Sequence, residues 1–262
     1  MSVENRLPLS VAIITLNEER NLPRCLESIR ELATEIIVVD SNSTDGTRAV
    51  AERFGAKFEV HPWSGQINQC RVALSRCTQP WVLCLDADEA LSPELAASIR
   101  QIFASGEPSV NGFAINRRTF YLGRWIDHVW YPEWRLRLAR RNAAEWIGRE
   151  PHYVLSVPGA TARLAGDLLH YSFRDLQDHL HKSIKWARMS AYGAEKEARS
   201  FPWAGILFAP WIAFFKQLVI KQGWRDGWRG WLIAGVKMVN VFAKYAFVQE
   251  RRWEKESKDR RA

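Results

Sequence analysis

The stretch Trp81-Val82-Leu83-Cys84-Leu85-Asp86-Ala87-Asp88 decides the fold, because an apolar run ends abruptly in two carboxylates. A short apolar run of this kind is typical of a strand buried on both faces. In an open α/β sheet, ligands bind at the carboxyl ends of the strands, which is where this strand delivers Asp86 and Asp88. Two neighbouring carboxylates repel each other and lose hydration, and a divalent cation bound to phosphate oxygens would relieve both costs. The stretch therefore predicts a metal–phosphate site at a sheet edge.

The residues around this stretch alternate between strand-like and helix-like segments. We expect strands at 10–16, 35–40, 57–60 and 81–85, and helices near 22–29, 48–54, 66–76 and 93–106. Ser92-Pro93-Glu94 is a strong helix start, because serine caps, proline fits the first turn and an acid favours the helix dipole. The alternation predicts a mostly parallel sheet with helices on both faces. Further strands are expected at 112–121, 134–140 and 162–169, and the chain reads as helical from Leu176 onward.

The expected fold class is therefore α/β, with a Rossmann-like domain over residues 1–175 and a C-terminal helical region over 176–262. A chain of 262 residues with 47% apolar and 25% charged residues suits one sizeable core with an appendage. The four cysteines form no CxxC pair and are interpreted as reduced, buried thiols of a cytosolic protein. The chain starts with the polar segment Met1–Arg6, so no signal peptide is expected and the α/β domain should face the cytoplasm.

The net charge of +8 belongs to the C-terminal third, since the net charge is +10 from Lys182 onward and −2 before it. Seven of the thirteen tryptophans lie in the same third. The apolar segment Trp203–Phe215 is only thirteen residues long and contains Pro210, whereas a membrane span needs about 20 residues. Interleaved basic residues and tryptophans favour an interfacial helix on anionic lipid, and the alternative is a cap packed on the core or on a second subunit. Nucleic-acid binding is not expected, because no recognised motif accompanies the charge.

Polar side chains follow three of the expected strands, and these loops should lie side by side along one edge of the sheet. They hold Thr15, Asn17 and Glu19 in the first loop, Asp40, Ser41, Asp45 and Gly46 in the second, and Asp86, Asp88 and Glu89 in the third. The sequence has neither a P-loop nor a dinucleotide fingerprint. A phosphate at this edge would therefore be met by a metal ion rather than by a glycine-rich loop.

Three motifs in this order resemble the family 2 glycosyltransferases of the GT-A fold. They are Val11-Ala12-Ile13-Ile14-Thr15-Leu16-Asn17-Glu18-Glu19, Ile37-Val38-Val39-Asp40-Ser41-Asn42-Ser43-Thr44-Asp45-Gly46-Thr47 and Leu85-Asp86-Ala87-Asp88-Glu89. Most of the chain is similar to the lipopolysaccharide-core β-1,4-glucosyltransferase subgroup, through residues 130–138, the His152 region and the tail around Gly227 and Lys244-Tyr245. The resemblance is looser after residue 110.

The resemblance implies a role for each motif residue. Asp40 matches the acid that contacts the uracil or ribose of a UDP-sugar, and Thr15, Asn17 and Glu19 match residues of the nucleotide pocket. Asp45 belongs to the same motif, with capping of the next helix as its alternative role. Asp86 matches the acid nearer the sugar and ribose, and Asp88 matches the ligand of Mg²⁺ or Mn²⁺ on the diphosphate.

Transfer from such a donor needs a general base, because the acceptor hydroxyl loses its proton as it attacks the sugar from the face opposite the diphosphate. An in-line attack inverts the anomeric centre. Glu133 stands roughly where the family carries its acidic base motif, although Trp134 replaces the expected second acid. Asp127 is the second candidate base, and the structural alternative for Glu133 is an ion pair with Arg135 or Arg137.

Three further residues are candidates for auxiliary roles. His152 and His170 are interpreted as acceptor contacts or an extra metal ligand, or else as structural histidines. Arg137, with Arg140 and Arg141, would contact phosphates of an anionic acceptor or form a solvated strand edge.

The resulting hypothesis is an inverting, metal-dependent transferase that moves a sugar, glucose by subgroup resemblance, from a UDP-sugar to a lipopolysaccharide-core or other lipid-linked acceptor. It would lie peripherally on the inner face of the bacterial cytoplasmic membrane, with an oligomer allowed. The alternatives are a polyisoprenyl-phosphate glycosyltransferase, a nucleotidyltransferase and a non-catalytic membrane-associated sugar-binding protein.

Overall fold

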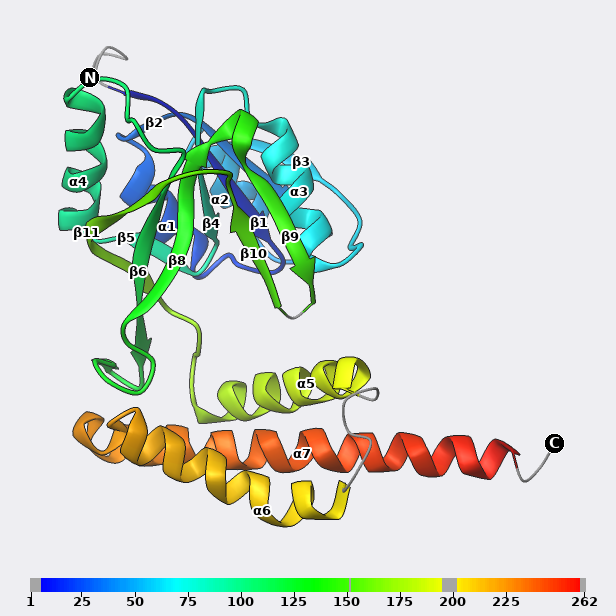
Figure 1. Cartoon of the computed structure of the whole chain (residues 1–262). Coiled ribbons are helices and arrows are strands. Elements are labelled where there is room, and N and C mark those ends of the chain that lie inside the picture. The colour runs from blue at the N-terminus through cyan, green and yellow to red at the C-terminus, as the bar shows by residue number, and fades with distance from the viewer. Residues whose placement is uncertain (1–5, 151, 195–201, 260–262) are drawn as a thin grey trace. The chain divides into compact units, whose positions relative to one another are not determined.

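The structure is a computed structural model that describes residues 6–150, 152–194 and 202–259 (Figure 1). The chain forms two compact units: a sheet unit, which runs up to Thr119 and resumes at Pro132–Ser172, and a helical unit of Phe120–Tyr131 and the chain from Phe173 onward. The segment Phe120–Tyr131 thus belongs with the C-terminal helices. The expected division of the chain at residue 175 places this segment in the first domain. The polar segment expected at the start of the chain is Met1–Arg6, and residues 1–5 of it lie outside the described residues.

One large mixed sheet forms the sheet unit, in the order β3-β2-β1-β4-β8-β6-β11-β5, with β7 paired to β6. The strands are β1 (Leu7–Thr15), β2 (Ala33–Asp40), β3 (Lys57–Val60), β4 (Trp81–Asp86), β5 (Glu89–Leu91), β6 (Gly112–Tyr121), β7 (Arg124–Trp125), β8 (Glu133–Arg140) and β11 (Thr161–His170). The first four strands are parallel, as expected from the alternating sequence, so their carboxyl ends meet at one edge. Strand β8 then runs antiparallel to both β4 and β6.

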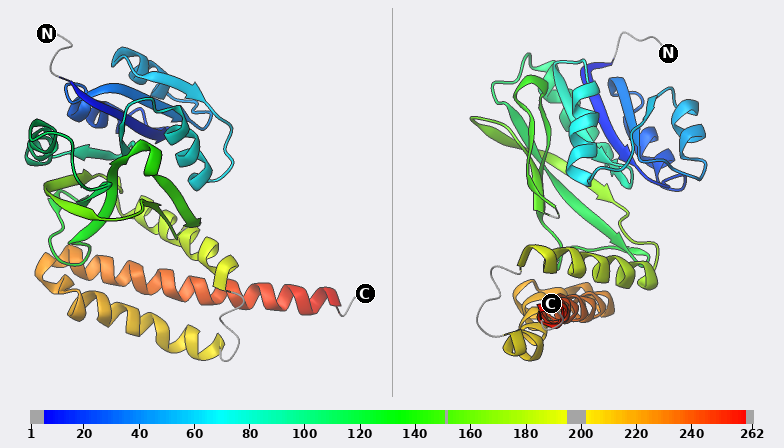
Figure 2. Two further views of the ribbon diagram at one scale, coloured as in Figure 1. Left: turned by 45° about the horizontal axis from the view of Figure 1, so that its top comes forward. Right: turned by 90° about the vertical axis from the view of Figure 1, so that its right-hand side faces the viewer.

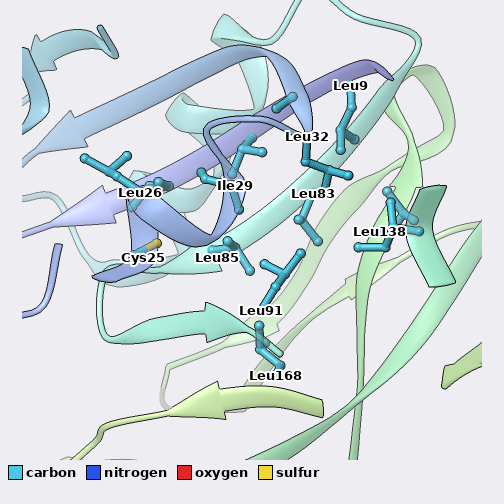
Figure 3. Packing of buried hydrophobic residues seen from close by; sticks show 14 of the residues in the cluster. Leu9, Cys25, Leu26, Ile29, Leu32, Leu83, Leu85, Leu91, Leu138 and Leu168 are labelled. Carbon is cyan, nitrogen blue, oxygen red and sulfur yellow. The ribbon is translucent and has the colours of Figure 1, made fainter. Parts of the chain in front are cut away.

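Both faces of the parallel strands are covered, which explains why these strands read as continuous apolar runs. The helices α1 (Leu22–Ile29), α2 (Thr47–Arg53) and α4 (Pro93–Ala104) pack on one face, over the cluster drawn in Figure 3. The other face is covered by α3 (Gln66–Arg76) and a separate hairpin of β9 (Glu145–Arg149) and β10 (His152–Ser156). Helices on both faces confirm the predicted fold class.

Alternate residues of each strand point to opposite clusters, as the period of two in a strand requires. In β4, Leu83 and Leu85 join the cluster under α1 and α4, while Val82 and Cys84 join the one under α3. All four cysteines are free and buried, and burial raises the pKa of each thiol, which confirms the expected unpaired thiols.

The start of α4 is fixed by a serine cap and by close contact with β11. Ser92 caps α4 as predicted, because its hydroxyl accepts a hydrogen bond from the Leu95 N–H at 3.1 Å. The β11 strand passes so close to this helix start that a Cβ on Gly166 would lie 2.3 Å from the Leu95 nitrogen. Gly166 also has a φ of +88°, so glycine is required there for space and for backbone conformation.

The helical unit contains α5 (Leu176–Ala194), α6 (Pro202–Phe215), a π-helical turn η3 (Lys216–Ile220), a 3₁₀ turn η4 (Gly223–Asp226) and α7 (Trp228–Asp259). Helix α7 packs against both α5 and α6, which lie on opposite sides of it (Figure 2). Judged by length and composition alone, one described helix, Trp228–Lys258, is suited to crossing a membrane, because its most apolar 18-residue window has a mean hydropathy of 1.3. The sequence does not make this helix stand out as a membrane span, because Lys237 and Lys244 interrupt its apolar run.

Candidate active site

Strands β1 and β2 bring Thr15 and Asp40 together at the carboxyl edge of the sheet. The two residues are register partners, and the Thr15 hydroxyl donates to Asp40 Oδ1 at 2.8 Å. Asp40 Oδ2 accepts a hydrogen bond from the Ser43 N–H at 2.7 Å, so the carboxylate also organises its own loop. Thr15 and Asp40 are 4% and 1% exposed, so both residues are nearly buried at this edge.

In these two loops Asn17, Glu19 and Asp45 are exposed, and hydrogen bonds join one loop to the other. Asn17 has a φ of +56°, and its side-chain oxygen accepts from the Thr44 N–H at 2.8 Å. Glu19 Oε2 accepts from the Gly46 N–H at 3.0 Å, and Asp45 Oδ2 accepts from the Glu19 N–H at 3.2 Å. The two loops therefore form one hydrogen-bonded edge.

Asp45 also adopts the helix-capping role that the sequence left open. Its Oδ1 accepts a hydrogen bond from the Thr47 N–H at 3.0 Å at the start of α2. Although partial burial acts to raise the pKa of Asp45, the hydrogen bonds from Thr47 outweigh it and the pKa is lowered. The group is therefore an ionised cap.

The first acid of the pair, Asp86, is neutralised by Arg137. Arg137 Nη2 lies 2.9 Å from Asp86 Oδ2 and 2.9 Å from Glu89 Oε1, and the Asp86 N–H donates to Glu89 Oε2 at 3.0 Å. Arg137 and Glu89 are 7% and 1% exposed. The sequence predicted that a cation would relieve the charge repulsion at both Asp86 and Asp88. At Asp86 an arginine, Arg137, supplies this positive charge.

A shift of strand register delivers Arg137 to this position. Phe113 of β6 faces Leu138 of β8, but Ala114 faces Leu136, so Arg137 is an extra residue of the β-bulge type. Bulges of this kind redirect a side chain and are common beside active sites. Arg137 is accordingly buried beneath the acids rather than placed on a solvated strand edge.

A chain of ion pairs continues from Asp86 to Glu133. It contains Asp86, Arg137, Glu89, Arg117 and Glu133, and we call it the ion-pair chain. Arg117 lies between two acids, with Nη1 3.3 Å from Glu89 Oε1 and Nε 2.7 Å from Glu133 Oε2. Asp86 and Glu133 are therefore connected electrostatically through Arg137, Glu89 and Arg117.

Glu133 forms a second ion pair, because Arg135 Nη2 lies 2.6 Å from its Oε1. Burial acts to raise the pKa of Glu133, but the two arginines outweigh it and lower the pKa to about 2. The carboxylate is therefore ionised at any ordinary pH. Asp127, the other candidate base, belongs to the helical unit, where its N–H donates to Asp226 Oδ1 at 3.0 Å.

The second acid, Asp88, is near a histidine. His170 ends β11 opposite Glu89 of β5, and its Nε2 lies 3.5 Å from Asp88 Oδ2. The Tyr171 N–H donates to the Asp88 carbonyl at 2.9 Å, which fixes the backbone of this loop. His152, by contrast, is exposed on β10. Of the two candidate histidines, His170 is the one beside the acid pair.

A small pocket, with room for about one water molecule, lies beside Asp86 on the side covered by α3. Among its lining residues are Asp86, Arg137, Cys70 and Trp146. Arg137 Nε and Trp146 Nε1 are buried N–H groups without a hydrogen-bond partner in the described part of the chain. Buried donors of this kind are costly when unpaired, so a water molecule that accepts their hydrogen bonds suits this pocket.

Sequence reasoning listed Glu89 among the edge acids without assigning it a role, and did not single out Arg117. A signal for Arg117 exists in β6, because Phe113 and Ile115 are buried on the same face two residues apart. Continuing that alternation points Arg117 inward, where a charged residue needs a buried acid.

The fold and the acid-lined sheet edge define a GT-A glycosyltransferase. Residues 10–155 match the family model described as glycosyl transferase family 2, and the chain belongs to this family. The chain is also 31% identical over 255 residues to the lipopolysaccharide core biosynthesis glycosyltransferase LpsC of Rhizobium meliloti, covering 94% of this chain and 93% of that one.

Other relatives agree with this assignment. An uncharacterized glycosyltransferase of Rickettsia typhi is 47% identical over 204 residues, covering 74% of this chain and 70% of that one. Among solved structures, the mannosyltransferase PcManGT of Pyrobaculum calidifontis, in complex with GDP-Man and Mn²⁺, has a TM-score of 0.51 at 15% identity, covering 94% of this chain and 88% of that one. At that identity the likeness concerns the fold. The family assignment favours a glycosyltransferase over the nucleotidyltransferase and non-catalytic alternatives.

Proposed function

We propose that this glycosyltransferase moves a hexose, glucose by subgroup resemblance, from a UDP-sugar to a lipopolysaccharide-core or other lipid-linked glycan acceptor, with inversion. The observation that carries the proposal is the joint arrangement at one sheet edge of the Thr15–Asp40 pair and the Asp86–Arg137 pair, with Asp88 beside His170. The relative named for lipopolysaccharide core biosynthesis supports the acceptor class, since it matches nearly the whole chain.

In the proposed complex, the loops of β1 and β2 bind the nucleotide. Asp40 would accept from the uracil or ribose, and Thr15 orients it through their mutual hydrogen bond. Asn17, Glu19 and Asp45 maintain the loop edge through the hydrogen bonds described above. Asp86 would accept from sugar or ribose hydroxyls, with its orientation held by Arg137.

The residues present fit a divalent cation on the diphosphate. Asp88 and His170 offer a carboxylate oxygen and an imidazole nitrogen 3.5 Å apart, and few protein ligands are needed where phosphates complete the shell. No group of three or more metal-binding side chains occurs among the described residues. Mg²⁺ or Mn²⁺ bound there would neutralise charge on the leaving diphosphate.

Glu133 is the proposed general base, with Asp127 as the alternative. Arg117 and Arg135 keep the Glu133 carboxylate ionised, which a base requires before the reaction. The same arginines weaken it as a base, so proton transfer is expected late, after the attacking hydroxyl has become acidic. His152 is proposed as an acceptor contact because it is exposed on β10.

The proposed location is the cytoplasmic face of the bacterial inner membrane, bound peripherally through the basic, tryptophan-rich helical unit. An anionic lipid surface complements the net charge of +10 from Lys182 onward. An oligomer is compatible with this location, and nucleic acid is not a proposed partner.

A panel of UDP-sugars with and without Mn²⁺ tests the donor, and lipid-linked core glycan against polyisoprenyl phosphate tests the acceptor. Asp88→Asn is expected to abolish transfer and to remove the dependence of UDP binding on the metal. Asp178→Asn is a matched control, because Asp178 pairs with Lys182 on α5, outside the proposed site. Wild-type turnover by Asp88→Asn would contradict the proposed metal site.

A further inference from the structure

The outer side of helix α6 carries an apolar stripe that no described residue of the chain covers. Trp203, Leu207, Phe208, Trp211, Ile212 and Phe215 are each between 54% and 66% exposed. Their spacing of three or four residues places them on one face of the helix. We call this surface the α6 stripe.

The opposite side of α6 is also apolar, because it packs against α7. A Cβ on Gly205 would lie 2.4 Å from the Tyr245 ring, and the Phe214 and Trp231 ring centroids are 6.2 Å apart. Helix α6 therefore has no polar face to present to water. An all-apolar helix requires a non-aqueous environment on its free side.

Basic residues and tryptophans surround the end of α6. Lys216, Lys221 and Arg225 are exposed in the turns that follow it, together with Trp224 and Trp228. Tryptophan and lysine at the edge of an apolar surface are typical of the membrane interface, and the positive charge complements anionic headgroups. This composition favours a lipid bilayer over a second protein as the covering partner.

The packing of α7 argues against a membrane-spanning role for it. Asn240 of α7 donates to the Ser183 carbonyl of α5 at 2.7 Å, and the Arg188 guanidinium lies 5.7 Å from the Phe247 ring. Spanning would require α7 to leave α5 or to bring Lys185 and Arg188, both exposed on α5, into hydrocarbon. With the π-helical turn η3, the apolar helical segment Gly205–Ile220 still reaches only about 24 Å, short of the roughly 30 Å hydrocarbon core.

From these observations we infer that the helical unit is a monotopic membrane anchor: the α6 stripe inserts into one leaflet, and α7 lies along the membrane without crossing it. In Figures 1 and 2, α5 and α6 lie on opposite sides of α7, so α5 remains on the aqueous side of the unit. The inference deepens the peripheral location proposed above and rests on it, but not on the donor sugar or the catalytic residues.

Vesicle sedimentation of the full chain tests the insertion of the α6 stripe, with vesicles of 70% phosphatidylcholine and 30% phosphatidylglycerol. Leu207→Glu/Ile212→Glu is expected to lower the partition coefficient roughly 100-fold or more, because two large apolar side chains lose their lipid contacts. Leu176→Glu/Trp186→Glu is the matched control on α5, where these residues are 36% and 41% exposed, and it should bind as wild type.

A labelling experiment tests whether α7 crosses the membrane. Lys185→Cys and Trp253→Cys would be expressed separately and treated with a membrane-impermeant maleimide in inverted inner-membrane vesicles. The native cysteines are buried, so they add little background. Equal labelling at both positions is expected, whereas protection of residue 253 until detergent is added would overturn the inference.

Two other results would also overturn it. One is wild-type vesicle binding by Leu207→Glu/Ile212→Glu. The other is a dimer in solution that this variant converts to a monomer, with vesicle binding unchanged, since a second copy would then cover the stripe. UDP binding, measured in parallel by calorimetry, separates these outcomes from failure of the proposed function, because the sheet unit carries the nucleotide residues.

Discussion

Replacing Arg137 by methionine is the sharpest test of the ion-pair chain. The substitution keeps an unbranched side chain but removes the guanidinium group that lies 2.9 Å from both Asp86 and Glu89. The Glu89 side chain is 0% exposed, so in this variant its negative charge would be buried without hydration. Arg117 at 3.3 Å would be its remaining cationic partner among the described residues.

The magnitude follows from the burial of the pair. Removing one partner of a buried ion pair costs about 3–5 kcal/mol, and the partial compensation by Arg117 places the expected loss near 3 kcal/mol. For a unit of this size, such a loss corresponds to a decrease in melting temperature of roughly 6–12 °C.

Urea denaturation followed by circular dichroism measures the effect. Arg76→Met is the control, because Arg76 and its partner Glu59 are 48% and 38% exposed and their pair is worth at most about 1 kcal/mol. Adding Glu89→Gln to Arg137→Met should recover much of the loss, since it removes the unpaired charge. If Arg137→Met were no less stable than Arg76→Met, the assignment of Arg137 as the essential counter-charge would be refuted.

Three further outcomes are expected. Arg135→Gln should raise the pKa of Glu133 above about 2 and move the acidic limb of the pH–rate profile to higher pH; an unmoved limb would favour Asp127 as the base. Burial lowers the pKa of His179 to about 4, so between pH 6.5 and 4 the unfolded state binds a proton that the folded state does not. The free energy of unfolding should therefore fall by roughly 3 kcal/mol as the pH decreases over this range. His179→Phe should abolish this dependence on pH in thermal melts. Gly166→Ala should cost at least about 2 kcal/mol in denaturant titration, and Gly55→Ala, with φ +72° in open space, about 1 kcal/mol; equal losses would contradict the close contact with α4.

Local signals predicted the parallel half of the fold well. The buried strand before Asp86 and the Ser92 cap each depend on residues close in sequence, which is why the pattern alone identifies them. The positions of the edge acids followed from the rule that parallel strands end at one edge. Thr15 and Asp40 meet there as register partners.

The partners of the acids were not predictable in the same way. In the run Arg135-Leu136-Arg137-Leu138, simple alternation places both arginines on one face, and the register shift at Arg137 changes this. Register depends on contacts between β6 and β8, which are distant in sequence from β4. Strands β5, β9 and β10 are only three to five residues long, too short for a periodic pattern to stand out.

The ion-pair chain has a consequence for how the enzyme is assembled. Because Arg137 and Arg117 already supply counter-charges to Asp86 and Glu89, these acids can fold with internal counter-ions in place and before any cation is present. Many metalloproteins couple folding to metal loading, because their ligands repel one another until the ion arrives. Here folding does not wait for an ion, so the chain treated with a chelator should still unfold in one cooperative transition, even where the proposed metal-dependent transfer has stopped.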